Sequence, residues 1–523
     1  MSSIGSVVLL MTLVAAAAFA LVGVFYTGRR GISLEDYVVS RNQIGGATAL
    51  ASVTASALGA WILFSPPEAG SAFGGLTAIL GYCLGSAAAV LTFVFVGPRI
   101  RQIMPWGHSL NEYVRYRFAA ESGEDANDVT GHPPSGRPIT GHLMYGLTVV
   151  VMLLYMFVYL AAELTAIAQA LQLVLAVPLL VTSLVVITAV FIYTIYGGLK
   201  ATILTDAFQF ALIVPLLLLC FAATVWTLGG FGAAFGPVAD KLPALLSLNN
   251  IDGLRFGATL VIAIIAAELF NQGNWQRVYA CRTDQTVRRS FLGSALVILP
   301  MILISGLLGL IAAGFDMSGP TAFFDLLRRL QVANWLLVAV ILLALALVMS
   351  SIDTLLSGIS SVFTGDLLRL SADHRRVLLI SRMLTVVVGI PAVAIAAQGY
   401  SVLYLFFVAD LLCAALLFPI VFSLYSRYQT ASNAFCSSLI GIVVGVLFFP
   451  KPDFAPLFAV PGGGDLLNSF AAALVASTVI TLLWNTVNKT TNKSPFNYSD
   501  LKRVQPYGAI AQSSPVSTTT HLP

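Results

Sequence analysis

The distribution of hydrophobic and polar residues predicts a chain that crosses a membrane many times. Apolar runs of about 20 residues recur along the sequence, with short polar stretches between them. A run of that length is what a helix needs to cross the hydrocarbon layer of a bilayer. We therefore expect about 13 transmembrane helices, at residues 4–26, 45–68, 74–98, 142–174, 178–196, 201–228, 256–275, 290–314, 332–368, 376–398, 401–426, 432–449 and 466–486.

The composition agrees with this pattern and sets the fold class. Of the 523 residues, 58% are hydrophobic and 10% are charged, whereas soluble proteins carry roughly 25% charged residues. The sequence thus predicts an all-α integral membrane protein with one transmembrane domain over residues 1–487. We expect residues 99–141 to form a cytoplasmic loop with a short interfacial helix, and residues 488–523 to form a disordered cytoplasmic tail.

The positions of the basic residues indicate the orientation of the chain. If the N-terminus lies outside, 22 of the 27 lysines and arginines lie inside, and the outer loops keep only Lys241, Arg255, Arg328, Arg329 and Lys451. Such an excess on the cytoplasmic side is usual for membrane proteins. We therefore expect a multi-pass protein of the plasma membrane or bacterial inner membrane, with a cytoplasmic C-terminus. The net charge of +4 resides in short loops, so it does not indicate a nucleic-acid partner.

One predicted span becomes polar over residues 345–366. Ser350, Thr354, Ser357 and Ser361 recur there at helical spacing, so their hydroxyl groups share one face. A row of oxygen atoms inside a membrane suits a small alkali cation that has lost its water. Alternatively, the hydroxyls bond to their own helix or to a neighbouring helix.

Acidic residues inside the spans point to cation-coupled transport. No lysine or arginine lies clearly in the middle of a predicted span, but carboxylates lie in or near the spans at Glu68, Glu163, Asp206, Glu268, Asp353 and Asp410. Buried carboxylates without basic partners require a bound cation, a proton or a water-filled cavity. Glu163 and Glu268 could instead be protonated and hydrogen-bonded. We also expect Pro66 and Pro67 to break the second span, either at a site or at the outer surface.

Three motifs, in the right order and spacing, resemble the sodium/solute symporter family. Residues 196–201 (YGGLKA), followed by Asp206 and Gln209, are similar to the family signature. Residues 349–353 (MSSID) are similar to part of the eighth core helix of the family, and residues 28–37 are similar to its first loop. The family includes transporters for proline, sugars, choline, urea, pantothenate and iodide.

The resemblance implies a five-plus-five inverted-repeat transporter fold with flanking helices, and core repeats at about 45–228 and 256–426. It also implies a Na⁺ site between the first and eighth core helices, formed by Ala55, Leu58, Leu347, Ser350 and Ser351. Asp206 and Asp353 are candidates for a second sodium site or for coupling. Ala57 departs from the proline permeases, which carry an aspartate there.

The end of the seventh span resembles urea-type members of the family. Residues 275–277 (WQR) match the ending of that helix, and the Gly-Gln-Pro-His run of proline permeases is missing. We expect Arg277 to anchor the helix end at the membrane interface. Carboxylate and amide groups suit a small polar solute, and the candidate substrate residues are Glu163, Glu268, Asn271 and Gln272.

Together these features predict sodium-coupled symport of a small polar organic solute, such as urea or an amino acid, by alternating access. Na⁺ is then the coupling ion, and the partners are the solute and the lipid bilayer. The alternatives are a proton-coupled symporter of the same fold, a channel, and a non-transporting membrane sensor for such a solute. An enzyme is not indicated, because the sequence contains no recognisable set of nucleophile and base.

Overall fold

The computed structural model describes residues 33–119, 139–368, 373–491 and 494–504, together with three isolated positions before residue 33. The membrane-length helices are α5 (Leu76–Ile103), α7 (Ile139–Leu175), α8 (Leu179–Thr227), α13 (Asp284–Gly314), α15 (Asn334–Leu367), α16 (His374–Ala396), α17 (Val402–Ser423), α18 (Ala431–Phe448) and α19 (Leu466–Thr490). The shorter helices are α2 (Leu34–Val38), α3 (Gly46–Ala57), η1 (Ala60–Leu63), α4 (Ser65–Ala72), α6 (Leu110–Val114), η2 (Arg115–Ala119), α9 (Phe231–Lys241), α10 (Pro243–Leu246), α11 (Ile251–Leu269), α12 (Gln272–Ala280), α14 (Ala322–Arg329) and η3 (Tyr498–Arg503).

The predicted all-α membrane fold is confirmed, but the predicted number of spans is not. Within the described ranges, nine helices are long and apolar enough to cross a membrane, and the number reaches 11 if each of two bent pairs is one span. The predicted spans 178–196 and 201–228 join in α8, where Gly198 makes the bend with a φ of 54°. The first predicted span, 4–26, lies almost wholly outside the described residues.

Two transmembrane segments are broken part of the way along. Helices α3 and α4, with η1 between them, bend by 56°, and α11 and α12 bend by 59°. The prediction that Pro66 and Pro67 break the first segment is wrong, because α3 already ends at Ala57. Both prolines lie in the first turn of α4, where an N–H group would have no helical acceptor. The second break was not predicted, since residues 256–275 read as one span.

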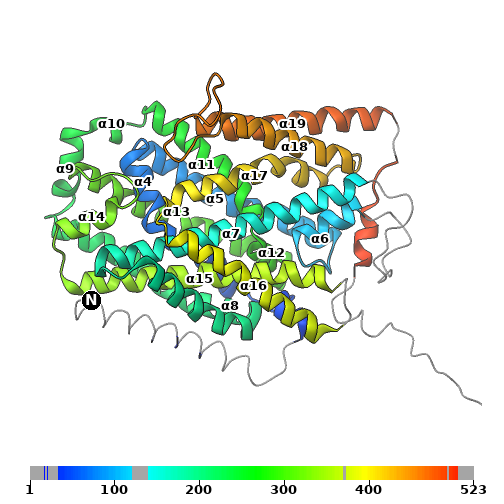
Figure 1. The fold of residues 1–523 in the computed structure, drawn as a ribbon, viewed down its shortest axis with the longest axis horizontal. Helices are drawn as coiled ribbons and strands as arrows, with labels where there is room; N and C mark the ends of the chain where they lie inside the picture. The colour runs from blue at the N-terminus through cyan, green and yellow to red at the C-terminus, as the bar shows by residue number, and fades with distance from the viewer. Residues whose placement is uncertain are drawn as a thin grey trace, which may run out of the picture.

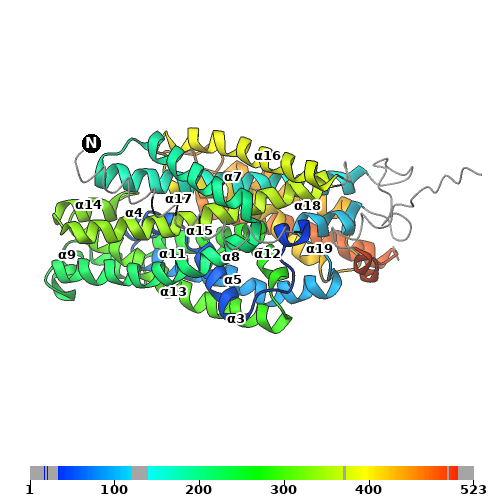
Figure 2. The ribbon, with the colours of Figure 1, turned by 90° about the horizontal axis from the view of Figure 1, so that it is seen from below.

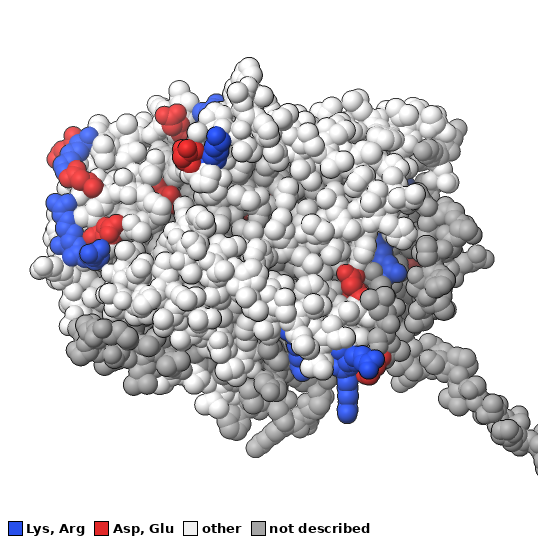
Figure 3. All heavy atoms as spheres, in the orientation of Figure 1, with Lys and Arg blue, Asp and Glu red and all other residues white. Residues whose placement is uncertain are grey.

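The helices lie mostly along the long axis of the molecule, with α9, α10 and α14 at one end and α6 and η3 at the other (Figures 1 and 2). Helix α15 is buried over most of its length and contacts α7, α8, α12 and α16. On the face shown in Figure 3, charged side chains gather towards the two ends, and a broad band between them is uncharged. This distribution is what a membrane-spanning bundle requires.

Two polar segments pack against the bundle, and for the start of the tail this corrects the expectation of disorder. The segment predicted to form a helix at the membrane surface forms α6 and η2, and every residue of α6 is buried. The tail is ordered at its start, since residues 494–504 pack on the end of α17. There Tyr498 Oη donates to the Ser423 carbonyl (2.7 Å), and the Leu501 side chain is only 1% exposed. A few apolar side chains in a polar stretch are enough to dock it.

Candidate functional site

A pocket inside the bundle is lined by aromatic rings and carboxylates. It lies between the bend of the first broken segment and helices α5, α7, α11 and α17, and we call it the central pocket. Its lining consists of Trp61, Tyr82, Tyr155, Tyr159, Leu260, Ile264, Ala267, Glu268, Leu403, Phe406, Phe407 and Asp410. The space is about 40 Å³, enough for a few water molecules, so the walls must move apart before a solute can enter.

Trp61, in η1, is held by aromatic neighbours in the middle of this lining. Its ring stacks on Tyr82, with centroids 5.5 Å apart, and meets Phe406 edge-on at 6.1 Å. Its Nε1–H group donates to Tyr159 Oη at 3.0 Å, and the Tyr159 ring packs against Phe406. The faces of such rings carry negative potential, which attracts ammonium groups.

Two carboxylates face the same pocket. Glu268, in the last turn of α11, accepts hydrogen bonds from Tyr155 Oη (3.3 Å), Asn271 Nδ2 (3.3 Å) and Asn274 Nδ2 (2.7 Å). Asp410, in α17, is 4% exposed, and its Oδ1 atom has no hydrogen-bond partner among the described residues. A buried carboxylate oxygen in this state is costly unless a proton or a cation compensates it.

A third carboxylate, Glu163 of α7, lies at the first helix break. Its Oε2 atom accepts the Ala60 N–H group at 2.8 Å, and its buried Oε1 atom has no partner within the described part of the chain. A Cβ atom at Gly59 would lie 1.9 Å from Oε1, so only glycine lets the carboxylate approach the break this closely. Glu163 therefore places a third carboxyl group beside the central pocket.

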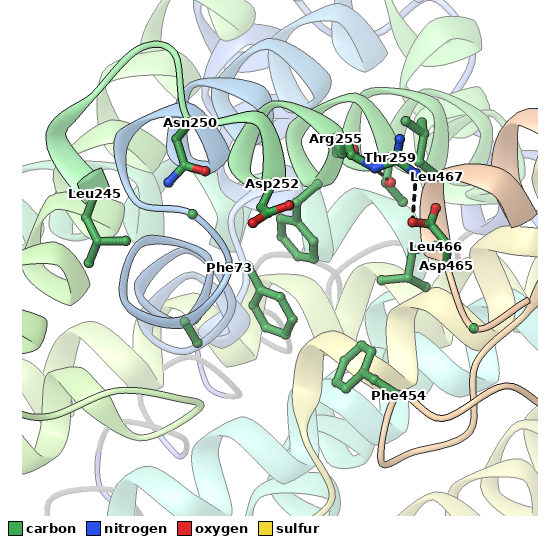
Figure 4. Close-up of a pocket in the computed structure, with 14 residues that line it drawn as sticks. Phe73, Leu245, Asn250, Asp252, Arg255, Thr259, Phe454, Asp465, Leu466 and Leu467 are labelled. Atoms are coloured by element: carbon green, nitrogen blue, oxygen red, sulfur yellow. Dashed lines mark hydrogen bonds and ion pairs between the residues drawn. The ribbon is translucent and has the colours of Figure 1, made fainter. Parts of the chain in front are cut away.

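A wider pocket of about 420 Å³ lies at the end of the molecule where α11 begins (Figure 4). Its lining includes Asp252 and an ion pair between Arg255 and Asp465 (2.7 Å). Phe256 also lines this outer pocket, stacks on Phe73 at 4.4 Å and meets Phe407 of the central pocket at 5.9 Å. Aromatic rings thus separate the outer pocket from the central one.

Arg277 and Asp206 form a buried ion pair. We call this pair, together with the hydroxyl groups that bond to it, the Asp206–Arg277 cluster. Arg277 Nη2 lies 2.7 Å from Asp206 Oδ2, and both side chains are 0% exposed. The guanidinium also donates to Ser52 Oγ (2.8 Å), Thr354 Oγ1 (2.7 Å) and the Gly273 carbonyl (3.0 Å). The cluster joins helices α3, α8, α12 and α15.

This ion pair contradicts two of the predictions. Arg277 does not anchor the helix end at the membrane interface, and the buried acids are not all without a basic partner. Both predictions failed because the chain bends between Leu269 and Gln272. The bend places α12, whose first residues were predicted to end a straight span and whose remainder was predicted to follow it, inside the protein.

The residues predicted to bind Na⁺ lie at the first helix break and on α15. Leu58 is the first residue after α3, and its N–H group donates to the Ala55 carbonyl at 3.3 Å. Ser351 Oγ donates to the Leu347 carbonyl at 3.1 Å, and Ser350 Oγ donates to Asp206 Oδ1 at 2.6 Å. Ser350 therefore links this group to the Asp206–Arg277 cluster.

The predicted substrate residues are only partly brought together. Glu268 and Asn271 are hydrogen-bonded to each other, and Glu268 lines the central pocket. Gln272 points elsewhere, since its Nε2 atom donates to the His108 carbonyl (2.8 Å) and to Ser361 Oγ (3.3 Å). Asp353, predicted for coupling, accepts a hydrogen bond from Thr205 Oγ1 at 3.2 Å.

His108 belongs to a charged cluster at the end of the molecule opposite the outer pocket. Its ring nitrogens lie 2.8 Å from Glu35 and 3.0 Å from Glu112, and Arg41 pairs with Glu35 at 2.8 Å. Burial alone would raise the pKa of Glu35, but His108 and Arg41 outweigh it and lower the pKa to about 2. Burial alone would lower the pKa of His108, but Glu112 and Glu35 raise it above its usual value. The cluster ties the segment before α3 to the segment before α6.

The aromatic lining was missed from the sequence, although one signal was available. Tyr155, Tyr159 and Glu163 recur every four residues on α7, so they share one helical face. Trp61 and Asp410 lie in otherwise apolar spans. In such a span a tryptophan is usually a core residue, and an aspartate can lie near the membrane surface, so neither residue by itself indicates a site. Their common pocket depends on how the helices pack.

Comparisons with known proteins agree with this architecture. The family model described as "Sodium:solute symporter family" matches residues 135–441, which is more than half of the chain. The spermidine transporter DUR31 of Candida albicans is 26% identical over 491 residues, covering 92% of this chain and 84% of that protein.

Among solved structures, the fold resembles that of a Na⁺-coupled sialic acid symporter in a substrate-bound, outward-open state. The TM-score is 0.72 at 19% identity, and the match covers 95% of this chain and 99% of the symporter. A nucleobase-cation-symport-1 family transporter in a closed conformation matches with a TM-score of 0.55 at 12% identity, over 91% of this chain and 99% of that one. These likenesses confirm the predicted transporter fold.

Proposed function

We propose that this chain, which belongs to the sodium:solute symporter family, carries a small organic cation with several amino groups. Spermidine is the compound we choose to test this proposal. Membership makes the chain a multi-pass membrane transporter, not an enzyme, with Na⁺ as the coupling ion. The proposal therefore concerns which solute is carried and where the two ligands bind.

The observation that carries the proposal is the chemistry of the central pocket. Glu268 and Asp410 face a space walled by Trp61 and other aromatic rings. An ammonium group offsets the charge of these carboxylates, donates hydrogen bonds to them and is attracted by the ring faces.

The same pocket argues against the solutes suggested by the sequence. Urea is neutral and leaves the carboxylate charges uncompensated. An amino acid brings a carboxylate of its own, which Glu268 and Asp410 would repel. The relative from Candida albicans is described as a spermidine transporter, which supports a polycation at 26% identity.

We assign the coupling Na⁺ to the first helix break and α15, with Ala55, Leu58 and Leu347 offering carbonyl oxygens and Ser350 and Ser351 offering hydroxyls. Helix α3 ends at Ala57, and carbonyls at such an end are available to an ion because the helix does not continue past them. Trp61 lies only three residues beyond Leu58. An ion that orders this break therefore also orders one wall of the central pocket, which couples the two ligands.

The test is uptake of labelled spermidine into vesicles that contain the purified protein. We expect saturable uptake that requires a Na⁺ gradient and stops when K⁺ replaces Na⁺. An excess of putrescine should compete, whereas the same excess of urea or proline should not. Competition by urea or proline alone would refute the polyamine assignment and leave sodium coupling intact.

Two control conditions separate the remaining alternatives. Uptake that follows a pH gradient without Na⁺ would indicate a proton-coupled symporter of the same fold. Binding of spermidine without any uptake would indicate a sensor. Vesicles without protein, and vesicles loaded with equal Na⁺ on both sides, give the background for each measurement.

A further inference from the structure

Glu68, in the first turn of α4, is a buried carboxylate that is only weakly held. The residue is 5% exposed. Within the described part of the chain, its carboxylate oxygens accept hydrogen bonds from the Ser401 hydroxyl alone, over 3.4 and 3.5 Å, which is long for such a bond. A carboxylate inside a membrane needs a proton or a positive group beside it. Glu68 is therefore available to a cation that comes from outside the chain.

Glu68 lies on the wall between the outer and central pockets. Ala72, one helical turn further along α4, lines the outer pocket, and Trp61, just before α4, lines the central pocket. Tyr82, which also lines the central pocket, interacts electrostatically with both Glu68 and Asp410. A solute that passes from the outer pocket to the central pocket therefore meets Glu68 before it meets Asp410, whose buried Oδ1 atom lacks a partner among the described residues.

The two carboxylates are spaced like the ends of an extended polyamine. Ser401, which contacts Glu68, stands nine positions before Asp410 at the start of α17, or about 13 Å along the helix axis. Extended spermidine places its terminal nitrogens about 11 Å apart, and a hydrogen bond at each end adds about 3 Å. The molecule is therefore long enough to reach both carboxylates, whereas diaminopropane, with its nitrogens about 5 Å apart, is too short.

We propose that Glu68 is a second ammonium subsite, where the outer end of a linear polyamine binds while the inner end binds Asp410. A positive group offsets the charge of a buried carboxylate, and a linear polyamine brings one such group to each of the two positions. The inference rests on the proposed function and adds that the distance between the amino groups selects the solute. The alternative is that Glu68 holds a proton, in which case it does not distinguish solutes by their length.

The experiment uses two linear diamines with an amino group at each end, diaminopropane and diaminooctane, as competitors of labelled spermidine uptake into vesicles. Diaminooctane matches spermidine in length, so in the parent protein its inhibition constant should be lower than that of diaminopropane by about tenfold or more. Glu68→Gln keeps the size of the side chain and removes the charge, and should shrink the ratio of the two constants by about tenfold. The additional methylene groups contribute equally in both proteins, so the change in the ratio reports on Glu68.

Two further variants separate binding from a structural role. Ser401→Ala removes the hydrogen bond to Glu68 without changing any charge, and should keep the ratio of the parent. Glu68→Asp retains the charge and should keep most of that ratio. A ratio that Glu68→Gln leaves unchanged, or that Ser401→Ala reduces equally, would overturn the inference while spermidine uptake and the proposed function stand.

The parent protein provides a second measurement in case Glu68→Gln does not fold. Inhibition by diamines of increasing length should improve in one step, at the length where the chain first spans both carboxylates. An even gain for each added methylene group would overturn the inference. A parent that takes up no spermidine would overturn the inference and the proposed function together.

Discussion

Replacing Asp410 by asparagine is the most direct test of the central pocket. Asp410 Oδ1 is buried without a hydrogen-bond partner among the described residues, so the amide keeps the shape of the side chain and breaks no bond to that atom. Glu268 is a poorer choice, because Tyr155, Asn271 and Asn274 all donate to it, and an amide would face those donors. The effect of Asp410→Asn should therefore be chiefly the loss of one negative charge.

The magnitude follows from the charge interaction with the solute. An ammonium nitrogen about 4 Å from the carboxylate interacts with it by about 4 kcal/mol at an effective dielectric constant of 20. Loss of water around both groups offsets part of this, and hydrogen bonds to charged groups contribute about 1.5–3 kcal/mol net. We therefore expect Asp410→Asn to raise the apparent Michaelis constant for spermidine roughly 10- to 100-fold.

The assay is the concentration dependence of spermidine uptake at saturating Na⁺, normalised to the amount of protein in the membrane. Asp240→Asn is the matched control, since Asp240 is exposed on α9 and loses the same charge. The control should titrate like the parent. An Asp410→Asn protein whose apparent constant stays within twofold of the parent would refute the role given to the carboxylate.

Three further outcomes are expected. Ser351→Ala should raise the Na⁺ concentration for half-maximal uptake by about tenfold, which corresponds to a loss of about 1.4 kcal/mol in the free energy of Na⁺ binding. Ser351→Thr keeps the hydroxyl and should be tolerated. An alanine variant that titrates like the parent would remove Ser351 from the site. Reporter fusions at Thr491 and within residues 229–254 should lie on opposite sides of the membrane, and reports from the same side would reject the orientation. Because the pKa of Glu35 is lowered from 4.5 to about 2 in the folded protein, its contribution to stability is complete above pH 4.5 and is lost as the pH falls towards 2. Glu35→Gln should therefore flatten the dependence of the unfolding temperature on pH in that range, and an unchanged acid profile would show that the interaction with His108 does not stabilise the fold.

The sequence by itself determined the class of the protein. Long apolar runs and few charges leave a helical membrane bundle as the solution, because backbone groups in lipid must be paired within each segment. The motifs around Asp206, at residues 349–353 and at residues 28–37 indicated the symporter family, which the match over residues 135–441 confirms. These signals are local, since each depends on residues close together in the chain.

The site was decided by the tertiary structure. Trp61, Glu268 and Asp410 lie in segments far apart in sequence, and only the packing of η1, α11 and α17 brings them to one pocket. The bend between α11 and α12 carries Arg277 into the protein interior, where it meets Asp206. A hydropathy pattern shows whether a segment can be buried, but it does not show which charges meet inside, because that depends on the angles at which broken helices pack against their neighbours.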